Sequence, residues 1–154
     1  MQPGLLVSIH IAVGPEEPMQ IVQHTRAVAG KGLEGDRYFY GIGTFSGNGG
    51  PDREITLIEL EAIEAFERDY GVQLDAADAR RNLVTRGVAL NHLVDRKFKV
   101  GQATLQGIRL CEPCNHLTRV IGRQTIPGLI HRGGLRAQIL TDGLIQVGDP
   151  VEVL

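Results

Sequence analysis

The chain has 154 residues, of which 42% are hydrophobic and 22% charged, and its formal net charge is −2. This size and composition predict one soluble domain over residues 1–154, long enough to bury its own core. The longest apolar runs fall short of the roughly 20 residues of a membrane helix, and we expect no signal peptide. Two cysteines exclude a disulfide scaffold and favour the cytoplasm.

Charge is distributed unevenly along the chain. Residues 80–136 hold eleven basic and two acidic residues, a formal charge of +9, and the remainder carries −11. A cationic segment that contains both cysteines indicates an anionic ligand, unless the two halves neutralise each other across the fold. We expect no nucleic acid as partner, because Phe98 is the one aromatic residue in this segment. Single-strand binders interleave aromatic residues with basic ones.

The first half of the chain contains two strand patterns and one helix pattern. Apolar alternation predicts strands over residues 5–13 and 21–28, joined as a hairpin. The glycine-rich loop that follows lacks the Gly-Lys-Ser/Thr ending of a phosphate loop. In the helix pattern that comes next, Thr56 and Glu59 fit a capping box at the start, and Gly71 ends the helix.

The second half consists of short strands joined by tight turns. We expect strands over residues 80–87, 98–100 and 103–110, and two or three more over residues 137–154, with Asp142-Gly143 as a hairpin turn. Regular helices do not separate these strands, which argues against a βαβ sheet. The sequence therefore predicts a mainly β fold, a small mixed or antiparallel β-barrel with one or two helices.

The two cysteines lie in the stretch CEPCNH, residues 111–116. Cys111, Cys114 and His116 could bind zinc with His92 or His131, but a second C-x-x-C is missing. A dithiol redox pair at a strand end is a second reading, although the alternating strands and helices of thioredoxin are absent. Third, a thiolate beside arginines could bind a soft metal while the arginines hold a phosphate. His116 could then tune or protonate the thiolate.

A succession of segments resembles the MOSC domain, the C-terminal domain of molybdenum-cofactor sulfurases that also occurs as small stand-alone bacterial proteins. The segments are GKGLEGDRY, ITLIE, RRNLV, FKVGQATLQGIRLCEPC and HRGGLRAQILTDGLIQVGDPV. The resemblance extends from about Leu5 to Val153. It implies a MOSC-like, pyruvate-kinase-type β-barrel with a few helices, and the molybdenum cofactor (molybdopterin) as ligand.

The resemblance also implies roles for particular residues. The functional cysteine of the family falls on Cys114, which in relatives is proposed to ligate molybdenum or to carry sulfur as a persulfide. By position, the cofactor contacts would be Arg81, Asn82, His131 and Arg132. Many members have Gly-Glu-Asn-Leu where this chain has Arg-Arg-Asn-Leu, so the local charge here is more positive.

The activity that the resemblance implies has several forms. The protein would reduce N-hydroxylated compounds, or store, deliver or sulfurate the cofactor. Sulfur carriage would need a cysteine desulfurase as partner, and reduction would need an external electron donor, because the chain has room for neither module. The alternative function is a dithiol C-x-x-C redox protein without a metal cofactor, in which Cys111 and Cys114 matter equally.

Overall fold

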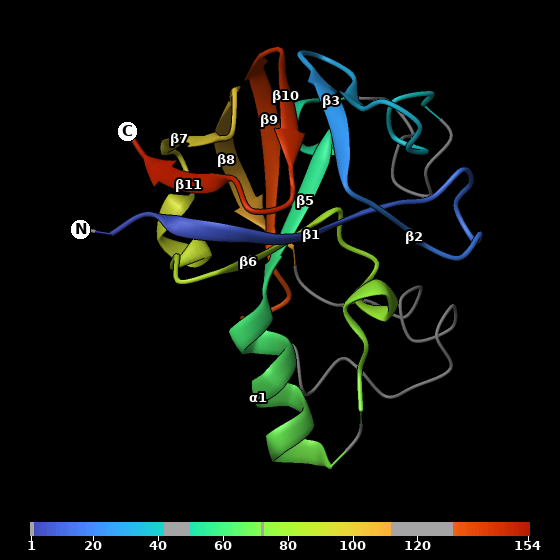
Figure 1. Ribbon diagram of the computed structural model, residues 1–154, viewed down its shortest axis with the longest axis vertical. Coiled ribbons are helices and arrows are strands. Elements are labelled where there is room, and N and C mark those ends of the chain that lie inside the picture. The colour runs from blue at the N-terminus through green and yellow to red at the C-terminus, as the bar shows by residue number, and fades with distance from the viewer. Residues whose placement is uncertain (1, 42–49, 72, 112–130) are drawn as a thin grey trace.

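The part of the chain that the structure describes forms a β-barrel with one α-helix below it (Figure 1). The computed structural model describes residues 2–41, 50–71, 73–111 and 131–154. Seven strands follow one another around the barrel in the order β1, β6, β5, β9, β8, β7 and β11, and β11 pairs with β1 to close it. This confirms the predicted mainly β barrel. The strands are β1 (Gly4–Ile11), β5 (Ile55–Glu59), β6 (Leu83–Arg86), β7 (Lys97–Val100), β8 (Ala103–Leu110), β9 (Leu135–Thr141) and β11 (Pro150–Val153).

Shorter elements surround the barrel. β2 (Gln20–Val22) pairs with β1, while β10 (Gly143–Gln146), β3 (His24–Val28) and β4 (Gly32–Leu33) form a separate three-stranded sheet. Three 3-10 turns complete the description: η1 (Pro51–Arg53), η2 (Ala76–Ala79) and η3 (Leu90–Leu93). Within the described ranges, no helix has both the length and the apolar character needed to cross a lipid bilayer.

Two hydrophobic clusters stabilise the fold, and β5 and β6 contribute side chains to both, one cluster on each face of these strands. Leu57 and Leu83 belong to the cluster that fills the barrel. Their neighbours Ile58 and Val84 point the other way and pack with α1 (Leu60–Tyr70) in the second cluster. A strand buried on both faces becomes a continuous apolar run rather than an alternating pattern.

This double burial explains why the predicted helix begins later than expected. Residues 55–59 form β5, between β6 and β9, and the capping box is wrong. Glu59 occupies the N-cap without a side-chain cap, and the Thr56 hydroxyl lies inside the fold, hydrogen bonded to Asn82. The predicted end of the helix is confirmed, since Gly71 takes the left-handed conformation (φ 66°) that terminates helices.

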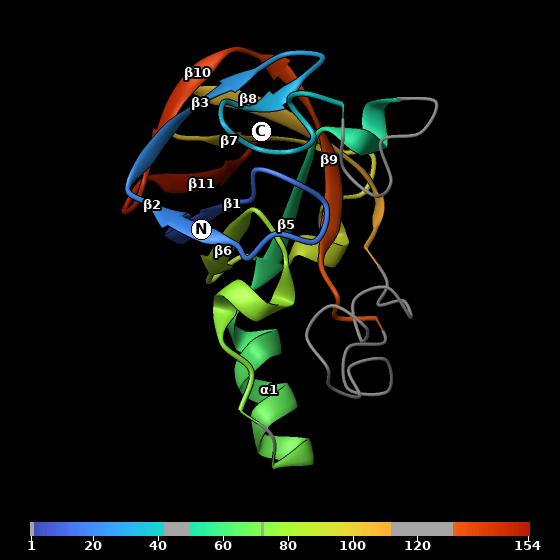
Figure 2. The ribbon, with the colours of Figure 1, turned by 90° about the vertical axis from the view of Figure 1, so that its right-hand side faces the viewer.

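The segment from β5 through α1 to β6 forms a βαβ unit within the barrel, a local feature that the sequence did not indicate. β5 and β6 pair in parallel, with Leu57 opposite Leu83. Parallel neighbours cannot be joined by a tight turn, so the chain crosses back through α1. Figure 2 shows this crossover as the helix that extends from the barrel.

Two hairpin predictions meet different outcomes. β1 pairs with β2 as an antiparallel hairpin, but the predicted second strand divides at Gln23, and β3 joins β10 and β4 instead. The Asp142-Gly143 hairpin is wrong, because β9 pairs with β5 and β8 while β10 pairs with β3. Asp142 instead accepts a hydrogen bond from the Ala29 N–H (2.7 Å), which fastens this corner to the loop after β3.

Candidate functional site

Cys111 follows β8 directly and is the described member of the cysteine pair. Its side chain is 2% exposed and its thiol is free. Its N–H donates to the Gly134 carbonyl (2.7 Å), so the end of β8 lies against the start of β9. A buried thiol of this kind behaves as a small apolar residue. Cys114 and His116 lie outside the described residues.

Arg81 ties together the chain on both sides of residues 112–130. Its Nε donates to the Gly133 carbonyl (2.8 Å), and its Nη2 donates to the Cys111 carbonyl (3.2 Å). Its Nη1 donates to Ala79 (3.3 Å), and the residue is buried. Hydrogen bonds from a charged donor are stronger than those from a neutral one. Arg81 therefore fixes the point where the C-x-x-C segment begins.

The Asn82 side chain takes part in a buried hydrogen-bond network that connects three strands. Its Oδ1 accepts from the Thr56 N–H (3.0 Å), and its Nδ2 donates to the His10 carbonyl (3.1 Å). The Thr56 hydroxyl accepts from the Asn82 N–H (3.0 Å). Burial lowers the pKa of the His10 side chain, which lies on β1. The network locks β1, β5 and β6 together beside Arg81.

Arg136 is buried on β9 and interacts with both Cys111 and Tyr38. A hydrogen bond joins the Arg136 and Tyr38 side chains, and Nη1 of Arg136 donates to the Asp52 carbonyl (3.3 Å). Burial by itself lowers the pKa of Arg136. The Cys111 thiol, Tyr38 and Asp52 more than offset that effect and hold the pKa above its ordinary value. A buried cation thus lies at the end of the barrel that carries the described thiol.

Two further buried arginines join the same cluster through Tyr38. The Arg37 guanidinium lies 4.5 Å from the centroid of the Tyr38 ring. Its Nη1 donates to the Asp36 carboxylate (3.0 Å) and its Nη2 to the Arg80 carbonyl (3.4 Å). Arg80 in turn donates to two carbonyls of the loop after β1, at 2.6 and 2.9 Å. Burial, followed by the charge of Arg37, lowers the pKa of Arg80.

Buried positive charge exceeds buried negative charge in the described part of the chain. The buried arginines are Arg37, Arg80, Arg81 and Arg136, and the buried carboxylates are Asp36 and Glu54. Burial raises the pKa of Glu54, because the charged form loses solvation. Carbonyl oxygens satisfy much of the hydrogen-bonding capacity of these arginines but do not neutralise them. This end of the barrel is therefore electrostatically suited to an anion.

On the surface, the two oppositely charged halves neutralise each other, as the alternative interpretation of the charge pattern proposed. Basic residues of the cationic segment pair there with acids from the rest of the chain. The pairs are Arg86–Glu64 (3.0 Å), Arg109–Asp52 (2.8 Å) and Arg132–Asp69 (3.0 Å). Exposed pairs of this kind contribute little to stability.

The described contacts of Arg132 and His131 are with residues outside the arginine cluster. Arg132 pairs with Asp69 near the C-terminal end of α1. The His131 carbonyl accepts from the Asn91 side chain (2.7 Å). Within the described residues, no three His, Cys, Asp or Glu side chains gather closely enough to hold a metal ion.

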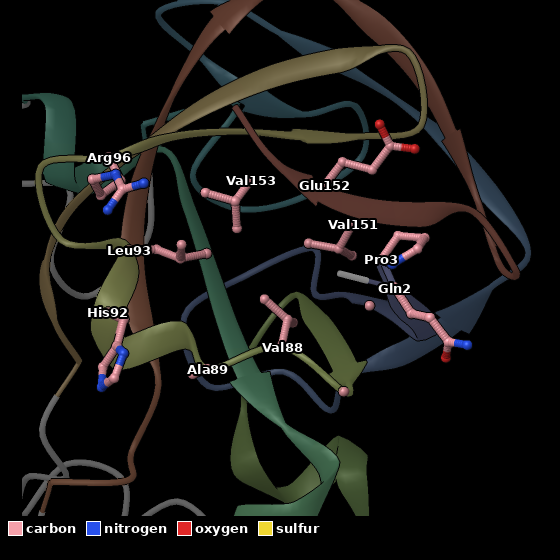
Figure 3. A pocket seen from close by; sticks show the side chains of 12 residues that line it. Gln2, Pro3, Val88, Ala89, His92, Leu93, Arg96, Val151, Glu152 and Val153 are labelled. Atoms are coloured by element: carbon pink, nitrogen blue, oxygen red, sulfur yellow. The ribbon is translucent and has the colours of Figure 1, made fainter.

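Two pockets lie on different sides of the barrel. The aromatic pocket, of about 310 Å³, adjoins the arginine cluster and is lined by Lys31, Tyr38, Phe39, Tyr40, Arg53, Glu54 and three glycines. A larger pocket of about 590 Å³ lies between the N-terminal residues, η3 and the end of β11 (Figure 3). Val88, Leu93 and Val151 form part of its lining. His92, which the sequence offered as a possible zinc ligand, lines the larger pocket, whereas Arg81, Asn82, His131 and Arg132 do not.

Four residues of the cluster, Arg37, Tyr38, Arg80 and Arg136, were not predicted as site residues. A signal for the first two was present, because DRY directly follows a glycine-rich loop that allows close approach to a ligand. Arg136 carried a weaker signal, a single charge inside the apolar run of β9. Its burial becomes apparent only when β9 is seen between β5 and β8.

Comparison with known proteins gives a consistent result. The sequence pattern of the MOSC domain matches residues 45–152. No curated protein sequence matches the chain. The YuaD protein from Bacillus subtilis has a similar structure at 17% identity and a TM-score of 0.80, covering 97% of this chain and 94% of that one. YiiM from Geobacillus stearothermophilus shares the fold at 18% identity and a TM-score of 0.75, covering 99% of this chain and 75% of that one. YiiM from Escherichia coli shares it at 20% identity and a TM-score of 0.67, covering 96% of this chain and 70% of that one.

Proposed function

The chain belongs to the MOSC domain family, and from this premise we propose that it binds the molybdenum cofactor at the Cys111 end of the barrel. The Cys114 thiolate would be the metal ligand or the sulfur carrier. The observation that carries this proposal is the excess of buried arginines over buried carboxylates, with Arg81 hydrogen bonded to the Cys111 carbonyl. A thiolate is a ligand of the kind that soft transition metals prefer.

The residues present fit such a cofactor. Its phosphate is an anion, and guanidinium groups are the side chains best suited to phosphate. Arg136 is the strongest candidate to face the cofactor, because its charge interacts with Cys111 and Tyr38 at this end of the barrel. Arg81 and Asn82 would act behind it by holding strands and chain ends in place, since their described hydrogen bonds run to the protein itself.

When bound, the cofactor would supply two-electron redox chemistry at its metal. The chain's own part would be to anchor the metal through Cys114, to hold the anionic group with arginine, and to exchange a proton at the thiolate through His116. Reduction of an N-hydroxylated compound would need an electron-donor protein, and sulfur carriage would need a cysteine desulfurase. His131 and Arg132 remain proposed cofactor contacts whose described partners are Asn91 and Asp69.

The proposal is tested by purifying the protein gently from cells that make the cofactor, and measuring molybdenum and pterin. Cys114→Ser should retain at least tenfold less molybdenum than the parent, whereas Cys111→Ser, the matched control, should retain nearly as much. Absence of molybdenum and pterin from the parent would contradict the proposal. Equal loss of molybdenum from both variants would contradict the assignment of Cys114 as the single cysteine that anchors the metal.

A further inference from the structure

The aromatic pocket contains an unusual share of the aromatic residues of this chain. The protein has three Tyr, four Phe and no Trp. Three of these seven, Tyr38, Phe39 and Tyr40, are consecutive and line this one pocket. The rings of Phe39 and Tyr40 meet edge to face, with centroids 5.0 Å apart. A pocket of about 310 Å³ is at the small end of ligand sites, the size of a ring system with one substituent.

The lining of the aromatic pocket is also cationic. The Lys31 ammonium lies 5.1 Å from the centroid of the Phe39 ring, and Arg53 is a second cation of the lining. Glu54 is the one acid among the described lining residues, and its Oε1 already accepts two backbone N–H groups, at 3.0 and 3.2 Å. Lys31 and Arg53 against Glu54 give the described lining a formal charge of +1. Arg53 also pairs with Asp52 (3.5 Å), so Lys31 is the cation that we expect an anionic ligand to meet.

Tyr38 forms a shared wall between the aromatic pocket and the arginine cluster. It lines the pocket, and it also contacts Arg37 through its ring and Arg136 through a hydrogen bond. Arg136 in turn interacts with Cys111. A ligand in the pocket would thus lie next to the end of the barrel where the cofactor is proposed to bind.

We propose that the aromatic pocket binds a planar aromatic ring that carries a carboxylate or a similar anionic group. The ring packs against Phe39 and Tyr40, where edge-to-face and stacked contacts are favourable. The anionic group lies toward Lys31, with its charge opposite that of the ammonium. This goes beyond the proposed function because the binding needs no molybdenum, and it adds a specificity subsite for an aromatic acid.

The test uses the metal-free full chain and 2-naphthoate as a fluorescent probe at low ionic strength. We expect saturable binding, with amide chemical shifts changing at Gly30, Lys31 and Gly41, which line the pocket. Tyr40 is 61% exposed, so Tyr40→Ala leaves the core intact. It should weaken binding about threefold to tenfold, the range for loss of one aromatic contact. The matched control Tyr70→Ala, on α1, should leave affinity unchanged.

The anionic part is tested with the neutral amide of the same ring system. The carboxylate should bind more tightly than the amide, and Lys31→Gln should reduce that preference about twofold to fivefold, as expected for an exposed charge pair. Lys99→Gln, an exposed lysine of β7, is the control.

Three results would overturn the proposal. They are no saturable binding at millimolar probe, equal binding of acid and amide, and equal effects of Tyr40→Ala and Tyr70→Ala. Because the assay contains no metal, its failure would be distinguishable from failure of the cofactor proposal, which rests on molybdenum retention.

Discussion

Replacing Arg81 by Met should lower the free energy of unfolding by about 3 kcal/mol. The substitution removes the charged donors from the carbonyls of Ala79, Cys111 and Gly133, three acceptors that belong to buried residues. At a net contribution of roughly 1 kcal/mol for each hydrogen bond, the sum is about 3 kcal/mol. Methionine keeps much of the apolar stem, so the loss reports the hydrogen bonds rather than the packing.

Urea denaturation of the parent, Arg81→Met and the control Arg86→Met measures this effect. Arg86 is exposed and pairs with Glu64, so its replacement should cost about 0–1 kcal/mol. In a Cys114→Ser background, thiol labelling of Cys111 should be at least tenfold faster when Arg81 is replaced, because the end of β8 is released. A free energy of unfolding for Arg81→Met within about 1 kcal/mol of the parent value, together with unchanged labelling of Cys111, would refute this role of Arg81.

Three further predictions concern backbone geometry and pH. Gly134→Ala should lower the free energy of unfolding by about 3 kcal/mol in urea denaturation, because φ is 111° and the added Cβ would meet a backbone carbonyl of β5. In the control Gly148→Ala, φ is 96° but the Cβ would meet open space, so the loss should be about 1 kcal/mol. Burial raises the pKa of Glu54 in the folded protein above its ordinary value of 4.5. The free energy of unfolding should therefore fall as pH rises from 4.5 toward the raised pKa. Urea midpoints measured from about pH 4 to 8 should show this decrease in the parent and lack it in Glu54→Gln. A hydrogen bond from Arg68 is the main cause that holds the pKa of Asp69 at about 2. The stability that ionised Asp69 contributes is therefore present above pH 3.8 and lost as pH falls through about 2. Arg68→Gln should raise the pKa of Asp69 in an NMR titration.

The fold was predictable where each strand has one buried face or a distinctive end. The alternation in β7 and β8 and the left-handed Gly71 after α1 are local signals, and both predictions were confirmed. β5 was mistaken for the start of the helix because its apolar run is buried on both faces, against the barrel interior and α1. The pairing of β10 with β3 could not be predicted, since the strands are distant in the sequence and neither contains a register signal.

The candidate site was predictable in charge but not in detail. Counting basic residues identified the segment that supplies three of the four buried arginines of the described chain, Arg80, Arg81 and Arg136. The count could not separate buried from surface charge, and Arg109, which pairs with Asp52 on the surface, contributes equally to it. Arg37 comes from a loop that is distant in the sequence, and it joins the cluster through the Tyr38 ring and a hydrogen bond to the Arg80 carbonyl.

The most direct test of the central claim is X-ray absorption at the molybdenum edge of the purified, cofactor-loaded protein. The account predicts one protein sulfur ligand in the parent and in Cys111→Ser, and its loss from whatever molybdenum remains in Cys114→Ser. Identical sulfur coordination in the parent and Cys114→Ser would contradict the account, because the metal would then be held without the thiolate on which the proposed function depends.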